Sequence, residues 1–489
     1  MKISISYPPI ESSKGVPLLT QNRQFQYFHS PCYIYPMVPA YAATILDQAG
    51  HEVVWDDAIA QKKTYSEWLD AFNKSPSDLI AIEAKTPIIK RYWQVVKDIK
   101  SSNPKTTVVL MGDHVTAFPL ESFEKCPVDF IITGGDYDFG LKSIVEFIER
   151  GEGDANAAKL EAGVYYREGS NIKNTGKFCL SHDLNELPFI DRELTHWKDY
   201  AFDNGNYKRR PGTYTMVGRD CWWGKCAFCS WTTLFPQFRT RKPELLLDEI
   251  GMLIEKYKVK EVFDDTGTFP VGDWLGKFCD GMIERGYNEK IYFSCNMRFG
   301  ACTLERYKLM KKANFRFLLF GLESANAETL KKLNKGTNPQ QCIDSCRECS
   351  KAGLEPHVTI MIGYPWESEE DAKKTVQLGR FLLKKGYAKT LQATVVIPYP
   401  GTPLFKDCEK NSWLLTKDWN EYDMRRPIMK TPYPEARAQE MVRELYKVAY
   451  DPEFVARRLA SVRDLDDVKF IGRAAKSVIG HLTDFKPKK

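Results

Sequence analysis

The sequence predicts an α/β protein in which two parallel sheets follow one another along the chain, with a mostly helical region after them. Two observations lead to this prediction. Short apolar strands alternate with amphipathic helical stretches, and the alternation occurs as two separate series, in residues 1–150 and 211–405. Strands separated by helices at this spacing form βαβ units, which build parallel sheets. The 489-residue chain has a globular composition and a formal net charge of +6, so several domains are expected.

The first series, residues 1–150, predicts an open sheet of Rossmann-like type. Strands are expected at 2–9, 51–57, 78–84, 106–113 and 128–136, and helices at 39–50 and around 65–72. Ligands of such sheets bind outside the carboxyl ends of the strands. The candidate ligand-binding residues at these ends are Pro8, Pro9, Lys85, Thr86, Gly112, Asp113, His114, Gly134, Gly135 and Asp136.

The second series predicts a partial parallel barrel of the (β/α)6 type. Its strands are expected at 213–218, 259–265, 290–296, 315–321, 357–363 and 390–396. A complete eight-fold barrel needs about 250 residues, more than the range 211–405 provides. Residues 151–210, rich in Gly, Asn and charge, are expected to be a linker with a small strand pair, and residues 406–489 a mostly helical domain.

Two clusters of three cysteines compete as a metal site. Cys342, Cys346 and Cys349 belong to a predicted helix, where their spacing places them within an arc of about 60° on one face. The helix joins two barrel strands, so this face is expected to pack against the barrel. Buried free cysteines are common and usually inert. We therefore interpret this cluster as core packing.

The stretch CWWGKCAFC, which contains Cys221, Cys226 and Cys229, is the better candidate. It follows the first barrel strand directly, and barrel active sites are built from the loops at the carboxyl ends of the strands. Thiolates spaced this way on a loop can converge on one metal centre. Iron–sulfur clusters are normally held by four thiolates, so three would leave one iron open for another ligand. A zinc site is the chemical alternative, but no fourth ligand stands nearby in the sequence.

This loop resembles that of the cobalamin-binding radical S-adenosylmethionine (SAM) enzymes, a family that includes anaerobic methylases and cyclases. The family binds a [4Fe-4S] cluster through Cys-x3-Cys-x2-Cys with an aromatic residue before the third cysteine, and Phe228 occupies that position here. The first gap is one residue longer in this chain, and the flexible Gly224 is expected to absorb it. The resemblance covers residues 1 to about 405 and implies that the open iron binds SAM.

Further strand ends are similar to the family's barrel pattern. FDDTGTFP, CNMRFG and FGLESAN follow the second, third and fourth strands, and VIPYPGTPLF resembles the sixth-strand signature. Acidic strand ends are common, but their order around one barrel is specific. The resemblance implies that the following residues bind SAM: Phe228, Asp264, Asp265, Thr266, Gly267, Arg298, Glu323 and Ser324.

The N-terminal series resembles the cobalamin-binding domain of the same family. MGDHVTAFP, which includes Thr116, and IITGGDYDFG are similar to its two ligand-binding segments. The Asp-x-His-x-x-Gly motif, which supplies a histidine below cobalt, is absent. His114 is therefore expected to hydrogen-bond the corrin or the backbone, and the loop of Lys85 and Thr86 is a candidate for the lower face. The alternative is a Rossmann-like domain that has lost its ligand.

The resemblance implies an anaerobic enzyme that cleaves SAM to a 5′-deoxyadenosyl radical and functionalises an unactivated carbon, most readily by methylation through cobalamin. The alternatives are a radical cyclisation, ring contraction or rearrangement, and a non-catalytic cobalamin carrier or sensor. The family implies an external electron donor such as a flavodoxin or ferredoxin. The oligomeric state stays open.

Composition narrows the cellular setting. The start of the chain lacks the segments of a secretory signal, and no apolar run is long enough to span a membrane, so a cytoplasmic protein is expected. Thirteen cysteines, an odd number, fit reduced thiols better than a disulfide framework. The basic runs in the sequence are short, and this argues against a nucleic-acid partner. The 27 Phe and 11 Trp fit an apolar small-molecule substrate as well as an ordinary core.

Overall fold

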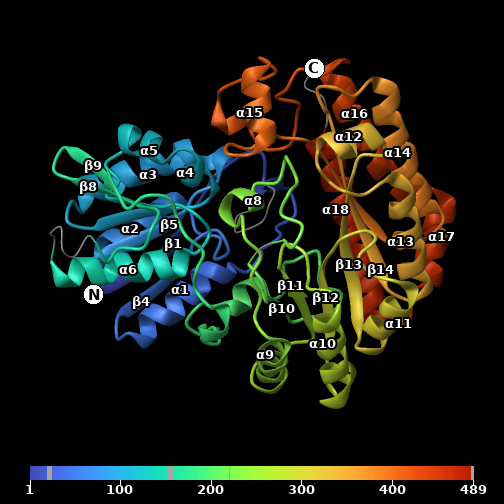
Figure 1. The fold of residues 1–489 in the computed structure, drawn as a ribbon, viewed down its shortest axis with the longest axis horizontal. Helices are drawn as coiled ribbons and strands as arrows, with labels where there is room; N and C mark the ends of the chain where they lie inside the picture. The colour runs from blue at the N-terminus through green and yellow to red at the C-terminus, as the bar shows by residue number, and fades with distance from the viewer. Residues whose placement is uncertain (19–24, 152–157, 220, 486–489) are drawn as a thin grey trace.

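The computed structural model describes residues 1–18, 25–151, 158–219 and 221–485. Two sheets lie side by side, one built from the N-terminal part of the chain and one from its middle, and the C-terminal helices cover the far side of the second sheet (Figure 1). No helix in these ranges combines the length and the apolar character needed to cross a membrane.

The first sheet has seven strands in the order β4-β1-β5-β6-β7-β8-β9. Its parallel part consists of β4 (Glu52–Asp57), β1 (Lys2–Tyr7), β5 (Leu79–Glu83), β6 (Thr107–Met111) and β7 (Phe130–Ile132). These are the strands expected from the sequence. Successive residues of a strand point to opposite faces, and each face is apolar here: Leu79 packs with α1 and α6, whereas Ile80 packs with α2 and α3.

Helices cover both faces of this sheet, as a doubly wound fold requires. One face carries α1 (Met37–Gln48) and α6 (Tyr137–Arg150), and the other carries α2 (Tyr65–Lys74), α3 (Ile89–Ser102) and α5 (Pro119–Lys125). The short α4 (Asp113–Ala117) lies directly after β6. Thr64 and Glu67 form a capping box at the start of α2, which satisfies two otherwise unpaired backbone N–H groups.

The strand pair expected within residues 151–210 is formed by β8 (Val164–Glu168) and β9 (Asn171–Asn174). Strand β8 pairs antiparallel with β7, so the pair extends the first sheet. A second small pair, β2 (Val16–Pro17) and β3 (Tyr27–Phe28), lies apart from it.

The second sheet has six parallel strands in chain order, which confirms the predicted partial barrel. Its strands are β10 (Gly212–Thr215), β11 (Glu261–Asp264), β12 (Tyr292–Met297), β13 (Phe315–Glu323), β14 (Glu355–Ile362) and β15 (Thr390–Val395). Between them lie α8 (Trp231–Leu234), α9 (Pro243–Glu255), α10 (Asp273–Glu284), α11 (Leu304–Lys312), α12 (Ala327–Lys332), α13 (Pro339–Lys351) and α14 (Glu369–Lys384). Strands β10 and β15 stand at its edges, so the barrel is open.

Helix α13 carries the cysteine cluster that the sequence analysis interpreted as core packing, and this prediction is confirmed. Cys342, Cys346 and Cys349 are fully buried in the main core. Burial raises the pKa of all three thiols, and that of Cys342 to about 12. They are therefore protonated, inert packing residues at neutral pH.

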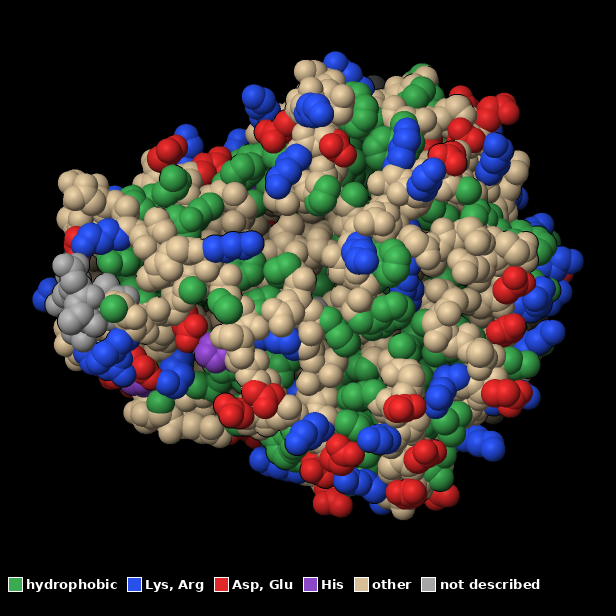
Figure 2. All heavy atoms as spheres, in the orientation of Figure 1, with side chains coloured by type: hydrophobic (Ala, Val, Ile, Leu, Met, Phe, Trp, Pro, Cys, Tyr) green, Lys and Arg blue, Asp and Glu red, His purple; other side chains and the backbone are tan. Residues whose placement is uncertain are grey.

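The C-terminal region is helical, as expected, with α15 (Pro403–Lys410), α16 (Glu435–Tyr446), α17 (Pro452–Ala460) and α18 (Leu465–Asp484). Helix α15 lies near the N-terminal unit, whereas α16 packs on α14 and β15, and α18 packs on α16 (Figure 1). On the face drawn in Figure 2, Lys and Arg side chains are interspersed with Asp and Glu, mainly around the rim, and the middle is largely uncharged.

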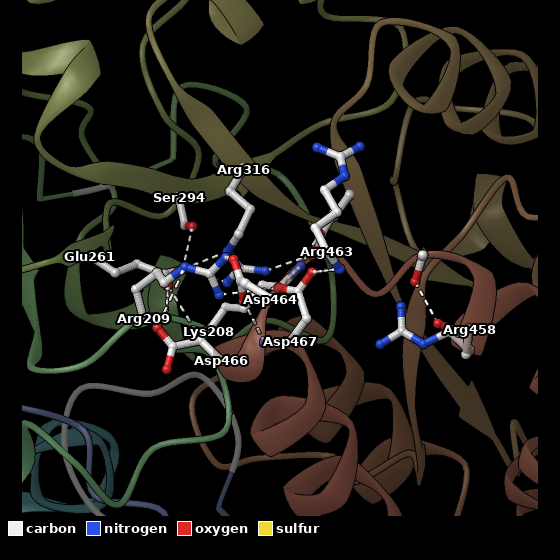
Figure 3. A network of polar contacts seen from close by, with 12 residues as sticks. Lys208, Arg209, Glu261, Ser294, Arg316, Arg458, Arg463, Asp464, Asp466 and Asp467 are labelled. Atoms are coloured by element: carbon white, nitrogen blue, oxygen red, sulfur yellow. Dashed lines mark hydrogen bonds and ion pairs between the residues drawn. The ribbon is translucent and has the colours of Figure 1, made fainter.

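An ion-pair network closes the amino end of the barrel (Figure 3). Glu261 of β11 accepts hydrogen bonds from the backbone N–H groups of Lys208 and Arg209, each at 2.8 Å, and from Nε of Arg316 at 2.7 Å. A second guanidinium nitrogen of Arg316 donates to Glu355 at 2.7 Å. The network therefore ties the linker to strands β11, β13 and β14 of the barrel.

The same network holds the start of α18. Lys208 Nζ lies 2.9 Å from Asp467, and Arg209 donates to Asp464 at 2.6 Å and to Asp467 at 3.1 Å. Carboxylates in the first turn of a helix are also stabilised by the helix dipole. The network thus attaches α18 to the base of the barrel.

The network makes part of the stability depend on pH. Burial alone would raise the pKa of Glu355, but Arg316 and Lys208 lower it to about 2, below the 4.5 of a free glutamate. A depressed folded-state pKa contributes stability above the unfolded pKa that is lost as pH falls from about 4.5 towards 2. At pH 6 we expect the free energy of unfolding of wild type to be about 3 kcal/mol higher than that of Glu355→Gln. This difference should become smaller as the pH falls below 4.5. Urea unfolding at several pH values measures it.

The exposed Glu284, at the end of α10, provides the matched control. Glu284→Gln should change stability little at either end of the pH range. A gap between wild type and Glu355→Gln that stays constant from pH 6 to pH 3.5 would contradict this assignment of the pKa.

Candidate active site

A cavity of about 570 Å³ runs through the second unit, from the loop after β10, through the barrel interior, to α17 and α18. Its carboxyl end is lined by the three cysteines of this loop and by residues that follow β11, β12 and β13. Its middle is lined mainly by apolar side chains of the barrel, such as Phe263, Phe317 and Met361. A concave, largely apolar site with a few polar groups at one end is typical of a small-molecule site.

The cysteine loop is held from two sides although it has no regular secondary structure. The backbone N–H of Ala227 donates to the carbonyl of Leu333, after α12, and its carbonyl accepts from the N–H of Leu404, at the start of α15, each at 2.9 Å. Gly224 has a φ of +58°, a conformation that costs glycine little. The longer first gap is therefore accommodated by a left-handed turn at Gly224, as the sequence analysis expected.

Trp223 anchors the middle of the loop to residues 334–336. Its indole N–H donates to the carbonyl of Asn334 at 2.8 Å, and a Cβ at Gly336 would lie only 2.2 Å from its ring. The guanidinium carbon of Arg298 lies 4.0 Å from its ring centroid, a cation–π arrangement. Arg298 also donates a short hydrogen bond to the carbonyl of Lys335. Trp223 thus connects the longer first gap of the loop to the end of β12.

All three loop cysteines line the cavity and are partly exposed. The Sγ of Cys221 lies 3.0 Å from Oγ1 of Thr268. Within the described ranges, no three His, Cys, Asp or Glu side chains are already gathered as a metal site. The donor set nevertheless fits an iron–sulfur cluster, because three thiols from one irregular loop open into the same cavity, and thiolates are the normal ligands of such clusters.

Five of the eight predicted SAM-binding residues line the cavity beside the cysteines: Phe228, Asp265, Gly267, Arg298 and Glu323. The carboxylate of Glu323 lies 2.7 Å from Nζ of Lys335, another lining residue. Burial disfavours the charge on Lys335, but the Glu323 carboxylate raises the pKa of Lys335, so this ammonium group is charged at neutral pH. Both signs of charge at this end suit a ligand with an ammonium and a carboxylate group.

The backbone at Glu323 is strained. Its φ is +63° at the end of β13, where the pairing with β14 is irregular. A residue with a Cβ pays of order 1–3 kcal/mol for this conformation, and such strain clusters at functional sites. The strain directs the carboxylate of Glu323 towards Lys335 in the cavity.

The other three predicted SAM-binding residues do not line the cavity. Asp264 is fully buried and accepts hydrogen bonds from Oγ1 of Thr215 and from the N–H groups of Val217 and Thr266. Thr266 accepts from the N–H of Gly218. These two side chains shape the start of the cysteine loop rather than facing a ligand.

Ser324 is also fully buried, and its hydroxyl donates to Glu367 at 2.5 Å. Adjacent residues at a strand end point in opposite directions, so one of each pair turns away from the cavity. Lys335 was missed by the sequence analysis, because it lies in the loop after α12 and not directly at a strand end.

The predicted cobalamin-binding residues gather at the carboxyl ends of β5, β6 and β7. Lys85 Nζ lies 3.8 Å from Glu83 and 3.5 Å from Asp113, and all three side chains are buried. One carboxylate oxygen each of Glu83 and Asp113, and the hydroxyl of Tyr137, are buried and form no hydrogen bond with the described residues. Such orphaned polar groups fit a ligand that supplies hydrogen-bonding partners, as the amide groups of a corrin would.

The backbone between these strand ends is closely packed. A Cβ at Gly112, where φ is +123°, would lie 2.2 Å from the carbonyl oxygen of Ala84. Thr116 donates to the carbonyl of Gly112 at 2.7 Å and accepts from the N–H of Gly134 at 3.1 Å. Pro8 and Pro9 are buried after β1, and Gly135 packs against the ring of Phe235.

Within the described ranges, both ring nitrogens of His114 lie beside side chains, whereas one of the two expectations was a hydrogen bond to the backbone. Its Nδ1 lies 3.3 Å from Oγ1 of Thr86 and its Nε2 lies 3.0 Å from Glu121. Trp419 lies 5.2 Å from the imidazole between ring centroids and donates to Glu121. Helix α5 begins soon after α4, and this brings the carboxylate of Glu121 next to the His114 ring. The carboxylate takes the place of the backbone group that was expected as the ring's partner.

Asp136 connects the two units instead of facing an open ligand site. It accepts hydrogen bonds from Arg219 at 3.1 Å and from Arg239 at 2.8 Å. Arg219, two residues before Cys221, also forms a bidentate pair with Asp138, and Arg219, Asp136 and Asp138 are buried. The N-terminal unit is thereby fixed to the start of the cysteine loop.

Comparison with known proteins agrees with this arrangement. Residues 215–379 match the family model described as the radical SAM superfamily. The chain is 28% identical over 436 residues to an uncharacterized methyltransferase of Pyrococcus horikoshii, covering 88% of this chain and 90% of the relative. It is 23% identical to an anaerobic magnesium-protoporphyrin IX monomethyl ester cyclase of Cereibacter sphaeroides, over 81% of this chain and 63% of the cyclase.

A solved structure has a similar fold over almost the whole chain. The cobalamin-dependent SAM radical enzyme OxsB, with aqua-cobalamin and SAM bound, superimposes with a TM-score of 0.69 at 14% identity, over 98% of this chain and 71% of OxsB. At this identity the likeness concerns the fold. The matched range contains the cysteine loop at the carboxyl end of the barrel, and this leads to one conclusion: residues 215–379 form a domain of the radical SAM superfamily.

Proposed function

We propose that this chain is a cobalamin-dependent radical SAM enzyme that functionalises an unactivated carbon of a small, largely apolar molecule, most readily by C-methylation. The observation that carries the proposal is the continuous cavity, which has Cys221, Cys226 and Cys229 at one end and the apolar barrel interior beyond them. A substrate in the barrel would lie directly against the cofactors.

In this proposal Cys221, Cys226 and Cys229 hold a [4Fe-4S] cluster, and Asp265, Glu323, Lys335 and Arg298 surround the amino-acid part of SAM. Lys335 and Arg298 supply positive charge for a carboxylate, and Asp265 and Glu323 supply negative charge for an ammonium group. When bound, the cluster and SAM supply a carbon-centred radical. The apolar walls exclude water from it, which prevents side reactions.

Cobalamin would occupy the carboxyl edge of the first sheet, where Glu83, Asp113 and Tyr137 each have a buried polar atom that forms no hydrogen bond with the described residues. When bound, it supplies a carrier for a methyl group. The ion pairs of Arg219 with Asp136 and Asp138 keep this edge at a fixed position relative to the cysteine loop. Such pre-organisation is what a reaction between two cofactors requires.

A radical cyclisation is the second candidate, and it is favoured by the relative of Cereibacter sphaeroides, whose name describes a cyclase. A non-catalytic cobalamin carrier is not favoured, because such a protein would not need the cysteine loop and the charged groups beside it. We further propose a cytoplasmic setting and a low-potential donor, such as a flavodoxin or ferredoxin, as the source of electrons.

Anaerobic reconstitution with iron, sulfide, SAM, cobalamin and a reductant tests the proposal. We expect both 5′-deoxyadenosine and S-adenosylhomocysteine, and we expect omission of cobalamin to remove only the second product. 5′-Deoxyadenosine without S-adenosylhomocysteine, with cobalamin present, would favour cyclisation or rearrangement. A reconstituted protein that leaves SAM intact would contradict the proposal and favour the carrier.

A further inference from the structure

The cavity does not end at the barrel interior. Beyond β14 and β15 it continues between the barrel and the C-terminal helices, where its walls are Phe454, Val455, Leu459, Phe470, Ile471 and Val478. Val455 is 38% exposed and Leu459 is 62% exposed, so this apolar branch opens to solvent beside α17. The cavity therefore has an end far from the cysteines, and that end is open.

This far end lies towards the amino ends of the barrel strands. Lys389, one of its lining residues, immediately precedes β15 and donates its backbone N–H to Pro356 of β14. The cysteine loop lies at the opposite, carboxyl end. A six-residue strand spans about 20 Å, so the two ends of the cavity are separated by roughly that distance.

The charges of the far end are of one sign. Lys389 and Arg458 line it, and Arg473 lines the neighbouring wall. Among the described residues that line the whole cavity, only Asp265 and Glu323 are acidic, and both belong to the cysteine end. The far end is thus a cationic position within an otherwise apolar branch.

Within the described ranges, none of these three cations forms an ion pair. The side chains of Lys389 and Arg458 are half-buried and form no ion pair or hydrogen bond with the described residues, and no dashed line reaches the guanidinium of Arg458 in Figure 3. Glu355 attracts both, but its oxygens already take Arg316 at 2.7 Å and Lys208 at 3.1 Å. Arg473 uses one nitrogen on the carbonyl of Tyr207, and its Nε is buried without a hydrogen bond.

Holding these charges half-buried costs free energy. Burial lowers the pKa of Lys389, Arg458 and Arg473, and the like charge of Arg458 lowers that of Lys389 further. A buried cation is normally paired, because only a partner of opposite charge offsets the free-energy cost of its desolvation. An anionic group on a ligand would offset this cost here. Hydrogen bonds between Arg or Lys and an anion are charge-assisted and are among the stronger hydrogen bonds in proteins.

We propose that Lys389 and Arg458 bind the anionic end of an elongated amphiphilic substrate, a carboxylate or phosphate, whose apolar body extends through the barrel towards the cysteine loop. This inference rests on the proposed function, since it assigns the substrate of the same cavity. The cations set which end of the molecule enters last, and so which carbon faces the cofactors.

Isothermal titration calorimetry on the full chain tests the inference with laurate, dodecyl phosphate and methyl laurate, which share an apolar chain and differ in the charge of the head. We expect laurate or dodecyl phosphate to bind at least about tenfold more tightly than neutral methyl laurate. The tighter of the two anions identifies the head group. Equal affinity for all three would overturn the inference.

Substitutions locate the effect. Lys389→Met and Arg458→Met should each weaken binding of the tighter anion by about tenfold and leave methyl laurate within about twofold, whereas Lys389→Arg should retain the anion. Arg457→Met is the matched control, because Arg457 is exposed and its side chain is paired with Glu453 of α17. An anion affinity that falls equally in Arg457→Met would also overturn the inference.

These outcomes are separable from those of the proposed function. Binding of laurate is measured without SAM, cobalamin or an assembled cluster. A protein that cleaves SAM but binds all three probes equally retains the proposed chemistry and loses only the anionic substrate. A protein that prefers the anions but leaves SAM intact retains the binding site and loses the chemistry.

Discussion

Replacing any one of Cys221, Cys226 and Cys229 by alanine should abolish SAM cleavage in the reconstituted protein and remove most of its iron and its cluster absorbance. The three thiols are the donor set at the carboxyl end of the barrel, and with one of them missing only two local ligands remain. Loss of a group that merely supports a metal ligand typically costs 10–100-fold, so loss of a ligand itself should cost more than about 100-fold.

Cys342→Ala is the matched control, because Cys342 belongs to the other cluster and is buried in the core. It should bind iron and cleave SAM as wild type does, with a stability loss of about 1 kcal/mol from the removed sulfur. If instead Cys342→Ala lost the cluster and the three loop variants kept it, α13 would be the metal site. Iron and sulfide content with the visible spectrum decides between the two.

Arg219→Met should lower the free energy of unfolding by about 3–5 kcal/mol, because it leaves the carboxylates of Asp138 and Asp136 buried with one positive partner fewer. Within the described ranges Asp138 would have no ion-pair partner left, whereas Asp136 would retain Arg239. Urea unfolding followed by fluorescence measures the loss. Protonation of Asp138 removes its unpaired negative charge, so Arg219→Met should lower the free energy of unfolding less at pH 5 than at pH 8.

Arg285→Met provides the comparison for Arg219→Met. Arg285 pairs with Asp248 at 2.5 Å on the surface, and exposed pairs contribute at most about 1 kcal/mol. The double variant Arg219→Met/Asp138→Asn should recover part of the loss, since it removes one of the stranded charges. Equal destabilisation by Arg219→Met and Arg285→Met would mean that the buried cluster does not hold the two units together.

The fold could be predicted from the sequence because its signals are local. Each apolar run between helical stretches became a strand of the expected sheet, and the order of six barrel strands followed from the rule that βαβ units are right-handed and parallel. The place of β8 and β9 could not be predicted, because their alignment with β7 depends on edge pairing, which no local pattern encodes.

The site could be predicted only to within one residue at each strand end. Asp264 and Asp265 are adjacent acids, yet Asp265 faces the cavity and Asp264 is buried among backbone N–H groups. A sequence shows that successive side chains of a strand alternate between two faces. Which of the two faces points inward is set by packing. Lys335 and the stacking of Arg298 on Trp223 depend on contacts between loops, which have no sequence period.

The ion pairs at the base of the barrel have a consequence for how the chain is made. Helix α18 both lines the cavity and is attached to the barrel by Asp464 and Asp467, but it follows every barrel strand in the chain. Domains fold from the N-terminal side during synthesis. A ribosome-bound chain that has completed the barrel therefore still has an unfinished wall, and the chamber for the substrate closes only when Asp464 and Asp467 emerge to meet Lys208 and Arg209.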